Sequence, residues 1–180
     1  MAGVTGGVDK SLLFRPVRIA VLTVSDTRTR ETDASGDMLQ NRIESDGHVL
    51  AGRALVKDEP ETIRATVQSW IADPSIDVIL TTGGTGLTGR DVTVEAVRPL
   101  FEKEIEGFAV LFHQVSFKTV GVSTLQSRAC AGLAGGTFVF LLPGSTGAVR
   151  DAWDNIIRLE IDSRHRPCNL VDLMPRTLEK

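Results

Sequence analysis

The stretch Val78-Ile-Leu-Thr-Thr-Gly-Gly-Thr-Gly-Leu87 joins an apolar run to a turn that contains three glycines. The apolar run predicts a buried strand that stops abruptly at the turn. Gly83, Gly84 and Gly86 lack a Cβ, so the backbone N–H groups of the turn can come close to an anion. This junction between a strand and the next element therefore predicts a phosphate cradle.

The residues that follow the turn add a carboxylate and the start of a helix. Helical spacing from Thr93 to Leu100 places a helix N-terminus close by, where its dipole favours the same anion. Asp91 would repel a phosphate unless a divalent cation lay between them, so the pattern indicates Mg²⁺-bridged phosphate chemistry. Thr82 and Thr85 supply hydroxyl donors to the same turn.

A glycine-rich turn can also do no more than reverse the chain tightly, and this reading stays open. The pattern matches neither common nucleotide-binding motif, because it lacks the Gly-Lys-Ser/Thr of a P-loop and the spacing of a Rossmann turn. The predicted anion site therefore belongs to a different class.

Composition favours one ordinary globular domain. The chain has 180 residues and a formal net charge of −3, with scattered arginines, so a nucleic-acid-binding role has little support. Cys130 and Cys168 are far apart without zinc-type spacing and are read as reduced thiols. Residues 1–14 are predicted to be a flexible tail with no apolar run long enough for a signal peptide or a membrane span, and a cytoplasmic protein is expected.

Strands and helices are predicted to alternate along the chain. The expected strands are 17–24, 48–56, 76–80 and 137–142, and the expected helices start near residues 35, 60, 93, 104 and 145. This order predicts an α/β fold, a three-layer α/β/α domain over residues 15–170 with a mostly parallel central sheet. Residues 171–180 are assigned to a C-terminal tail.

Several chemistry-bearing residues follow the predicted strands directly. Parallel strands end at one edge of a sheet, so these residues are expected to form one composite site. Taken singly, Asp58 is as well explained as a helix-capping or solvated acid and Ser145 as a helix N-cap. The expected site comprises Ser25, Asp26, Asp58, the glycine turn, Gly144 and Ser145.

Five motifs together resemble the MogA/MoaB molybdenum-cofactor family, which includes molybdopterin adenylyltransferases and the gephyrin G domain. They are Thr81–Gly86, Arg90–Thr93 with Glu95-Ala96, Ser123–Ala129, Pro143–Ser145 and Arg166–Asn169. The resemblance spans about residues 17–169. The third and fifth motifs are most similar to the MoaB branch.

The resemblance implies transfer of AMP from Mg²⁺-ATP to the terminal phosphate of molybdopterin, with release of pyrophosphate. Asp58 and Asp91 match the two functionally important acidic positions of the family and are expected to hold Mg²⁺ and orient the attacking phosphate. The glycine turn, Ser127, Arg128 and Ser145 are expected to contact the phosphates or the nucleotide. For Arg128, a surface or interface ion pair is an alternative.

Two further functions are considered beside adenylyl transfer. One is a non-catalytic molybdopterin- or nucleotide-binding assembly protein, and the other is molybdate insertion, which fits poorly because relatives with that activity carry extra domains. The strongly apolar helical segment 104–117 indicates a subunit interface. The resemblance implies a homo-oligomer, either a trimer or a hexamer.

Overall fold

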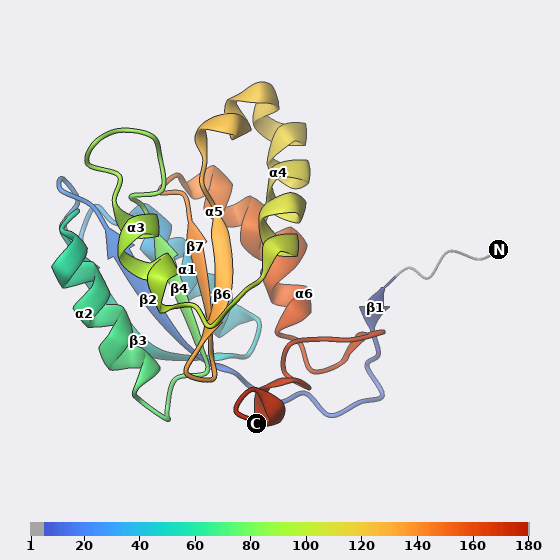
Figure 1. Cartoon of the computed structure of the whole chain (residues 1–180). Coiled ribbons are helices and arrows are strands. Elements are labelled where there is room, and N and C mark those ends of the chain that lie inside the picture. Colours follow the sequence, from blue (N-terminus) through green and yellow to red (C-terminus); the bar gives the residue numbers. More distant parts are fainter. Residues whose placement is uncertain (1–5, 180) are drawn as a thin grey trace.

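A computed structural model describes residues 6–179 of the chain. Its main sheet has six strands in the order β3-β2-β4-β7-β6-β5 (Figure 1). The strands are β2 (Arg18–Val24), β3 (Val49–Val56), β4 (Val78–Thr82), β5 (Lys103–Glu104), β6 (Cys130–Ala134) and β7 (Thr137–Leu142). The four strands from β3 to β7 are parallel, and β6 and β5 continue the sheet in antiparallel pairing.

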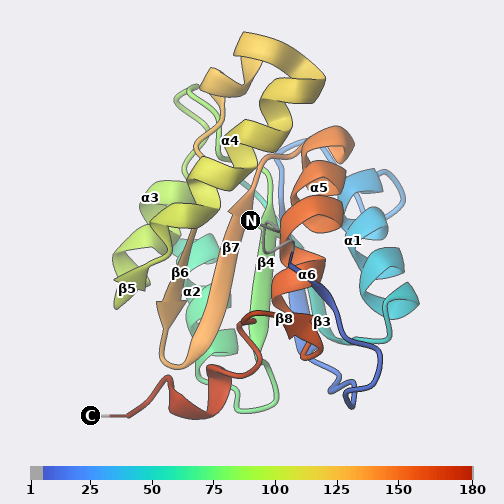
Figure 2. The ribbon, with the colours of Figure 1, turned by 90° about the vertical axis from the view of Figure 1, so that its right-hand side faces the viewer.

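Helices cover both faces of this sheet (Figures 1 and 2). One face packs against α1 (Ala34–Ser45), α4 (Glu106–Val120), α5 (Thr146–Ala152) and α6 (Arg158–Glu160), the last two joined by a π-helical turn, Trp153–Ile157. The other face packs against α2 (Pro60–Ile71) and α3 (Thr93–Val97). The α/β fold with three layers and a mostly parallel sheet is thus confirmed.

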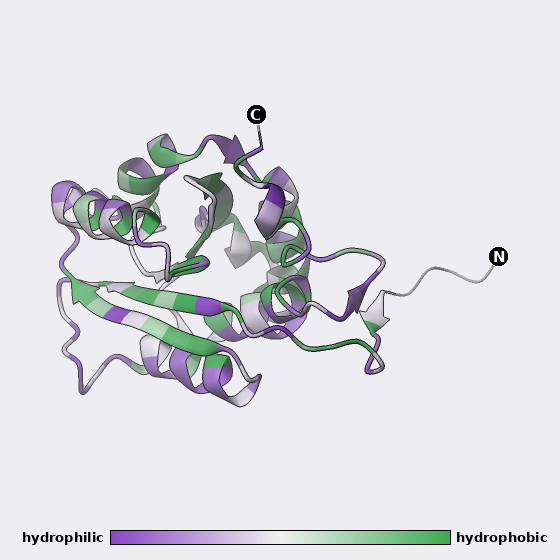
Figure 3. Cartoon of the chain, turned by 90° about the horizontal axis from the view of Figure 1, so that it is seen from below, coloured by the Kyte–Doolittle hydropathy of each residue, from purple (hydrophilic) through white to green (hydrophobic). Residues whose placement is uncertain are grey.

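The central strands are buried on both sides because their residues are apolar at nearly every position. In β4 all five residues are buried, and in β2 only Arg18 is exposed. Strands covered by helices on both faces need such continuous apolar sequences. Figure 3 shows the hydrophobic strands between helices that mix hydrophobic and hydrophilic residues.

The structure contains two strands in the main sheet that the sequence analysis did not predict. Strand β6 reads Cys-Ala-Gly-Leu-Ala, without the bulky β-branched residues that favour a strand. Its small residues have a packing reason, since a Cβ at Gly132 would collide with the ring of Phe101. Strand β5 includes Glu104, so helix α4 begins at Glu106, two residues later than expected, and it extends to Val120.

Parts of the two predicted tails contact the domain. Strand β1 (Gly7–Val8) pairs antiparallel with β8 (His165–Arg166). Val171 is buried in the core, and the 3₁₀ turn Met174–Arg176 follows it. Residues 1–5 and 180 lie outside the described residues. Among residues 6–179, no helix combines the length and the apolar character that crossing a membrane requires.

Candidate functional site

The carboxyl ends of three adjacent parallel strands meet at one edge of the sheet. Thr23 of β2 lies beside Thr82 of β4, which in turn lies beside Leu142 of β7. The loops that follow these strands enclose a cleft of about 420 Å³. It is lined by Val24, Ser25, Thr27, Arg28, Asp58, Gly83, Gly84, Thr85, Gly86, Arg90, Asp91, Ser127, Pro143 and Gly144.

The glycine turn adopts a conformation that side chains would prevent. Gly83 and Gly84 have φ angles of +107° and +66°. A Cβ at Gly83 would collide with the carbonyl oxygen of Val24, and one at Gly84 would collide with Thr93 Oγ1. Thr93 fixes the turn further, because its hydroxyl donates to Gly83 O (2.9 Å) and its N–H donates to Gly84 O (3.0 Å).

The two predicted carboxylates lie against glycines of this turn, Asp58 against Gly84 and Asp91 against Gly86. A Cβ at Gly84 would come within 3.0 Å of Asp58 Oδ1, and one at Gly86 would come within 2.8 Å of Asp91 Oδ2. Gly144, from the loop after β7, lies against the first glycine of the turn, since its Cβ would be 3.3 Å from the Cα of Gly83. The cleft therefore has a Gly144 end and a carboxylate end.

The two carboxylates differ in their electrostatic environment. Burial raises the pKa of Asp58, and repulsion from the nearby Asp26 and Asp91 carboxylates raises it further. At Asp91 burial acts in the same direction but is outweighed, because the hydroxyl and N–H of Thr88 both donate to Oδ2, at 2.6 and 2.9 Å. The pKa of Asp91 is consequently lowered, and this group is ionised at neutral pH.

Asp26 and Arg90 form the rim of the cleft beside Asp58. Arg90 donates through Nε and Nη2 to the two oxygens of Asp26, both at 2.8 Å, and this hydrogen bonding lowers the pKa of Asp26. The N–H of Asp58 donates to Asp26 Oδ1 at 3.2 Å. Asp26 is thus a positioning residue for the loop that carries Asp58 and is not among the residues that line the cleft.

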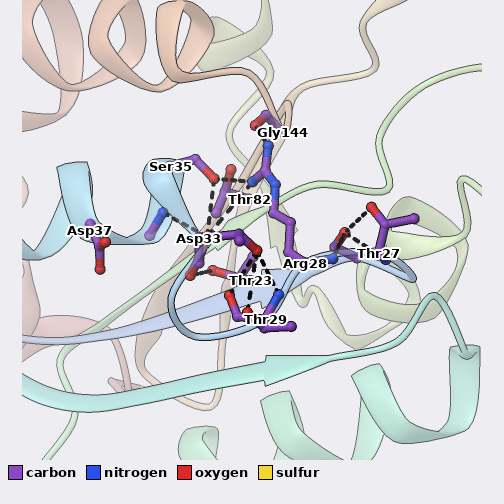
Figure 4. Close-up of polar contacts among 12 residues, drawn as sticks. Thr23, Thr27, Arg28, Thr29, Asp33, Ser35, Asp37, Thr82 and Gly144 are labelled. Atoms are coloured by element: carbon purple, nitrogen blue, oxygen red, sulfur yellow. Dashed lines mark hydrogen bonds and ion pairs between the residues drawn. The ribbon is translucent and has the colours of Figure 1, made fainter.

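Arg28 is a cleft residue that the sequence analysis missed. Its Nη2 donates to Gly144 O at 2.7 Å and its Nη1 donates to the hydroxyl of Ser35, so it connects β2's loop to α1 and to the loop after β7 (Figure 4). The available sequence signal was a cation three residues after Ser25, at the end of a buried strand. Arg28 brings a positive charge to the Gly144 end of the cleft.

Three predicted site residues have structural contacts outside the cleft lining. Thr82 Oγ1 donates to Pro143 O at 3.0 Å, and Ser145 Oγ accepts from Ala148 N at 3.2 Å as the N-cap of α5. Arg128 Nε donates to Gly86 O and Nη2 donates to Asp91 O, at 2.8 and 2.9 Å, and the guanidinium also pairs with Glu95. Arg128 therefore stabilises the glycine turn through the backbone carbonyls of Gly86 and Asp91.

The structure brings together nine of the predicted residues in one cleft, and places Asp26, Thr82, Arg128 and Ser145 directly behind it or at its rim. The nine are Ser25, Asp58, Gly83, Gly84, Thr85, Gly86, Asp91, Ser127 and Gly144. A cleft that combines glycine backbone, carboxylates and a cation at the carboxyl edge of a parallel sheet places this chain in the class of α/β proteins whose candidate ligand site lies where the strand order reverses.

Comparison with known proteins identifies the family. Residues 20–163 match the family described as "Probable molybdopterin binding domain". The chain is 51% identical over 156 residues to molybdenum cofactor biosynthesis protein B of Escherichia coli K12, covering 87% of this chain and 92% of that protein. It therefore belongs to the molybdopterin-binding domain family of molybdenum cofactor biosynthesis proteins.

Solved structures agree with this assignment. A crystal structure of a molybdenum cofactor biosynthesis protein B superposes with a TM-score of 0.82 at 40% identity, covering 92% of this chain and 98% of the other. The tungsten cofactor synthesizing protein MoaB from Pyrococcus furiosus gives a TM-score of 0.73 at 34% identity, with coverages of 82% and 93%. The resemblance to this family inferred from the sequence motifs is confirmed.

Proposed function

We propose that the protein acts in molybdenum cofactor biosynthesis by binding molybdopterin and transferring AMP to its terminal phosphate from Mg²⁺-ATP. The observation that carries the proposal is the pair of carboxylates, Asp58 and Asp91, held against Gly84 and Gly86 of the glycine turn that lines the cleft. The similarity to molybdenum cofactor biosynthesis protein B of Escherichia coli supports the pathway.

The residues of the cleft fit the groups that this reaction requires. Carboxylate oxygens are hard ligands, and Mg²⁺ is commonly bound by one or two of them together with substrate phosphates. The N–H groups of Gly84 and Thr85 have no acceptor among residues 6–179, so they remain free to donate to a phosphate. A cleft of about 420 Å³ is within the usual size range for small-molecule sites.

The chemistry needs little from a general base. An oxygen of the molybdopterin phosphate attacks the α-phosphorus of ATP, a new P–O bond forms, and the bond to the β-phosphate oxygen breaks to release pyrophosphate. The attacking phosphate is already ionised, so the protein has to position the two phosphates and offset their charge. Bound Mg²⁺ would neutralise charge on the triphosphate.

The two carboxylates would have different parts in this arrangement. Asp91 is ionised and fixed by Thr88, which makes it a preorganised metal ligand. Asp58 is buried beside other carboxylates, and a cation placed near it would favour its ionised form. The open N–H groups of the turn would stabilise charge on the phosphate oxygens, as in other sites with preorganised donors.

The experiment is a Mg²⁺-dependent assay of the purified protein with molybdopterin and ATP, following adenylylated molybdopterin and pyrophosphate. We expect product from the wild type and from Glu61→Gln, an exposed acid in α2 that serves as the control. Asp91→Asn should lower turnover by about 100-fold or more while keeping its fold. Binding of molybdopterin without any product in the wild type would overturn adenylyl transfer and favour the non-catalytic assembly function.

We also propose that the protein works as a homo-oligomer. Six large apolar side chains on α4 and the following 3₁₀ segment Gly121–Gln126 are 48–83% exposed. Large apolar side chains gathered on one helix and the segment after it, and exposed to this degree, indicate an interaction site. This α4 patch comprises Val110, Leu111, Phe117, Val120, Val122 and Leu125.

A further inference from the structure

The arginines around the cleft differ in how closely a carboxylate offsets their positive charge. Arg90 is paired in a bidentate manner with Asp26, and Arg128 is paired with Glu95. The carboxylate nearest to Arg28 is Asp33, and the closest approach of the two groups is 3.7 Å. Arg28 is thus the cleft-lining arginine whose charge is least neutralised.

The acidic residues next to Arg28 are engaged mainly by other groups. Asp33 is 1% exposed and accepts hydrogen bonds from the Thr23 hydroxyl (2.7 Å) and Arg53 Nη2 (2.9 Å). Asp37 pairs with Arg53 and Arg30, both at 2.7 Å. Asp33 is therefore engaged more closely by Thr23 and Arg53 than by Arg28, which approaches it only to 3.7 Å.

Burial opposes ionisation of Asp33, but its hydrogen bonds prevail and its pKa is lowered. The N-terminus of α1 adds to this, because Gly36 N donates to Asp33 Oδ1 at 3.0 Å. Asp33 is therefore a fixed anion that is fully engaged within the domain. Asp33 thus offsets only part of the charge of Arg28, whose contacts Figure 4 shows and which lines the cleft.

The Arg28 guanidinium is held in place yet keeps donors free. Two of its five N–H groups are used on Ser35 Oγ and Gly144 O, and the other three have no acceptor among residues 6–179. A fixed guanidinium with spare donors is suited to bidentate contact with a phosphate group. Gly144 and Gly83 line the same cleft as Arg28 and present no side chain there.

We propose that Arg28 binds a phosphate group that carries no metal ion, at the Gly144 end of the cleft. The carboxylate end, at Gly84 and Gly86, would repel such a group and suits a metal-bound phosphate instead. Building on the proposed function, this assigns the phosphate monoester of the acceptor to Arg28 and the Mg²⁺-nucleotide to Asp58 and Asp91. Arg128, for which the sequence also predicts a phosphate contact, is paired with Glu95 and does not line the cleft.

The test uses the full chain and two probes, inorganic phosphate without Mg²⁺ and Mg²⁺-ATP, with binding followed by NMR titration of backbone amides. Arg28→Gln should weaken phosphate binding by about 10-fold or more, since it removes charge-assisted hydrogen bonds. Arg30→Gln is the matched control, because it removes one positive charge from the same network at an exposed site outside the cleft lining. We expect it to change phosphate affinity by less than about 2-fold.

The second probe separates the two ends of the cleft. Asp91→Asn should weaken Mg²⁺-ATP and leave inorganic phosphate bound at least as tightly as in the wild type. Equal phosphate affinity in the wild type and in a folded Arg28→Gln variant would overturn the assignment and leave Arg28 as a brace between Ser35 and Gly144. If Arg28→Gln does not fold, Arg28→Lys, which keeps the charge and loses the fork, should still bind phosphate more weakly than Arg30→Lys.

Failure of this assignment can be told apart from failure of the proposed function. Phosphate binding that depends on Arg28, in a wild type that makes no adenylylated molybdopterin, would sustain the phosphate site and refute adenylyl transfer. Adenylyl transfer in the wild type with unchanged phosphate affinity and unchanged KM for molybdopterin in Arg28→Gln would refute the assignment alone.

Discussion

Arg90 and Asp26 come from loops 64 residues apart and meet in a bidentate pair with two 2.8 Å hydrogen bonds. The pair lies at the rim of the cleft. Asp26 also accepts a hydrogen bond from the N–H of Asp58, so the pair helps to fix the backbone of Asp58. Both partners are largely accessible to solvent, so the pair contributes more to geometry than to stability.

Arg90→Gln is therefore expected to slow the proposed adenylyl transfer by roughly 10-fold with little change in Tm, because Asp58 loses its alignment. Arg98→Gln provides the control, since Arg98 forms a similarly exposed pair with Glu104 outside the cleft lining, with Nε and Nη2 both donating to Oε2. Steady-state kinetics and thermal melts of both variants make the comparison. Indistinguishable turnover in the two would show that the rim pair has no part in the site.

The raised pKa of Asp58 predicts that this residue lowers the stability of the folded protein at neutral pH, although the proposed reaction needs it. An acid whose pKa is higher in the folded than in the unfolded protein lowers stability as pH rises through the interval between the two values. The penalty is absent below the unfolded value, about 3.9, and is complete once the folded group has ionised.

Asp58→Asn should accordingly be as stable as the wild type near pH 3.5 and more stable near pH 7, while losing adenylyl transfer. Urea unfolding between pH 3.5 and 8 measures this difference. Added Mg²⁺ with ATP should reduce the difference in stability between Asp58→Asn and the wild type, because a cation beside Asp58 offsets the burial and repulsion that raise its pKa. A variant that is less stable than the wild type at pH 7 would contradict the electrostatic account.

The glycine turn yields a prediction about backbone conformation. Gly83→Ala should cost at least about 2 kcal/mol of unfolding free energy, because it combines a positive φ with a collision against the carbonyl of Val24. Gly89→Ala is the control in the same loop, since a Cβ there meets no atom within 4 Å. Denaturant unfolding of the two variants measures this difference in unfolding free energy. Similar losses of unfolding free energy in both variants would refute the prediction.

Much of the fold could be predicted because its main signals are local. Apolar runs such as Val78–Thr82 have few alternatives to a strand buried on both faces, and the helices at residues 35, 60 and 145 carry recognisable starts. The cleft followed from the rule that parallel strands end at one edge. Asp58 could be predicted because it follows a predicted strand, and Asp91 because it follows the glycine turn.

What escaped prediction depends on partners distant in sequence. Strand β6 consists of small residues that are selected by the ring of Phe101 packed over Gly132, and no local pattern reveals that contact. Arg28 is held in position by Gly144, 116 residues later in the chain. Its charge is only partly offset because Asp33 is hydrogen-bonded to Arg53. These properties arise only from the assembled fold.

The α4 patch leads to a final prediction about assembly. The side chains of Phe117 and Leu125 are 56% and 83% exposed, and apolar surface of that extent is stabilised when a second copy covers it. Phe117→Glu combined with Leu125→Glu should convert the wild-type oligomer to monomer, measured by light scattering after size-exclusion chromatography. Leu87→Glu and Leu178→Glu, which replace leucines that are 69% exposed outside the patch, should leave the oligomer intact. A wild-type protein that is monomeric at high micromolar concentration would rule out self-association through this surface, and an oligomer that survives the double substitution would place its interface elsewhere.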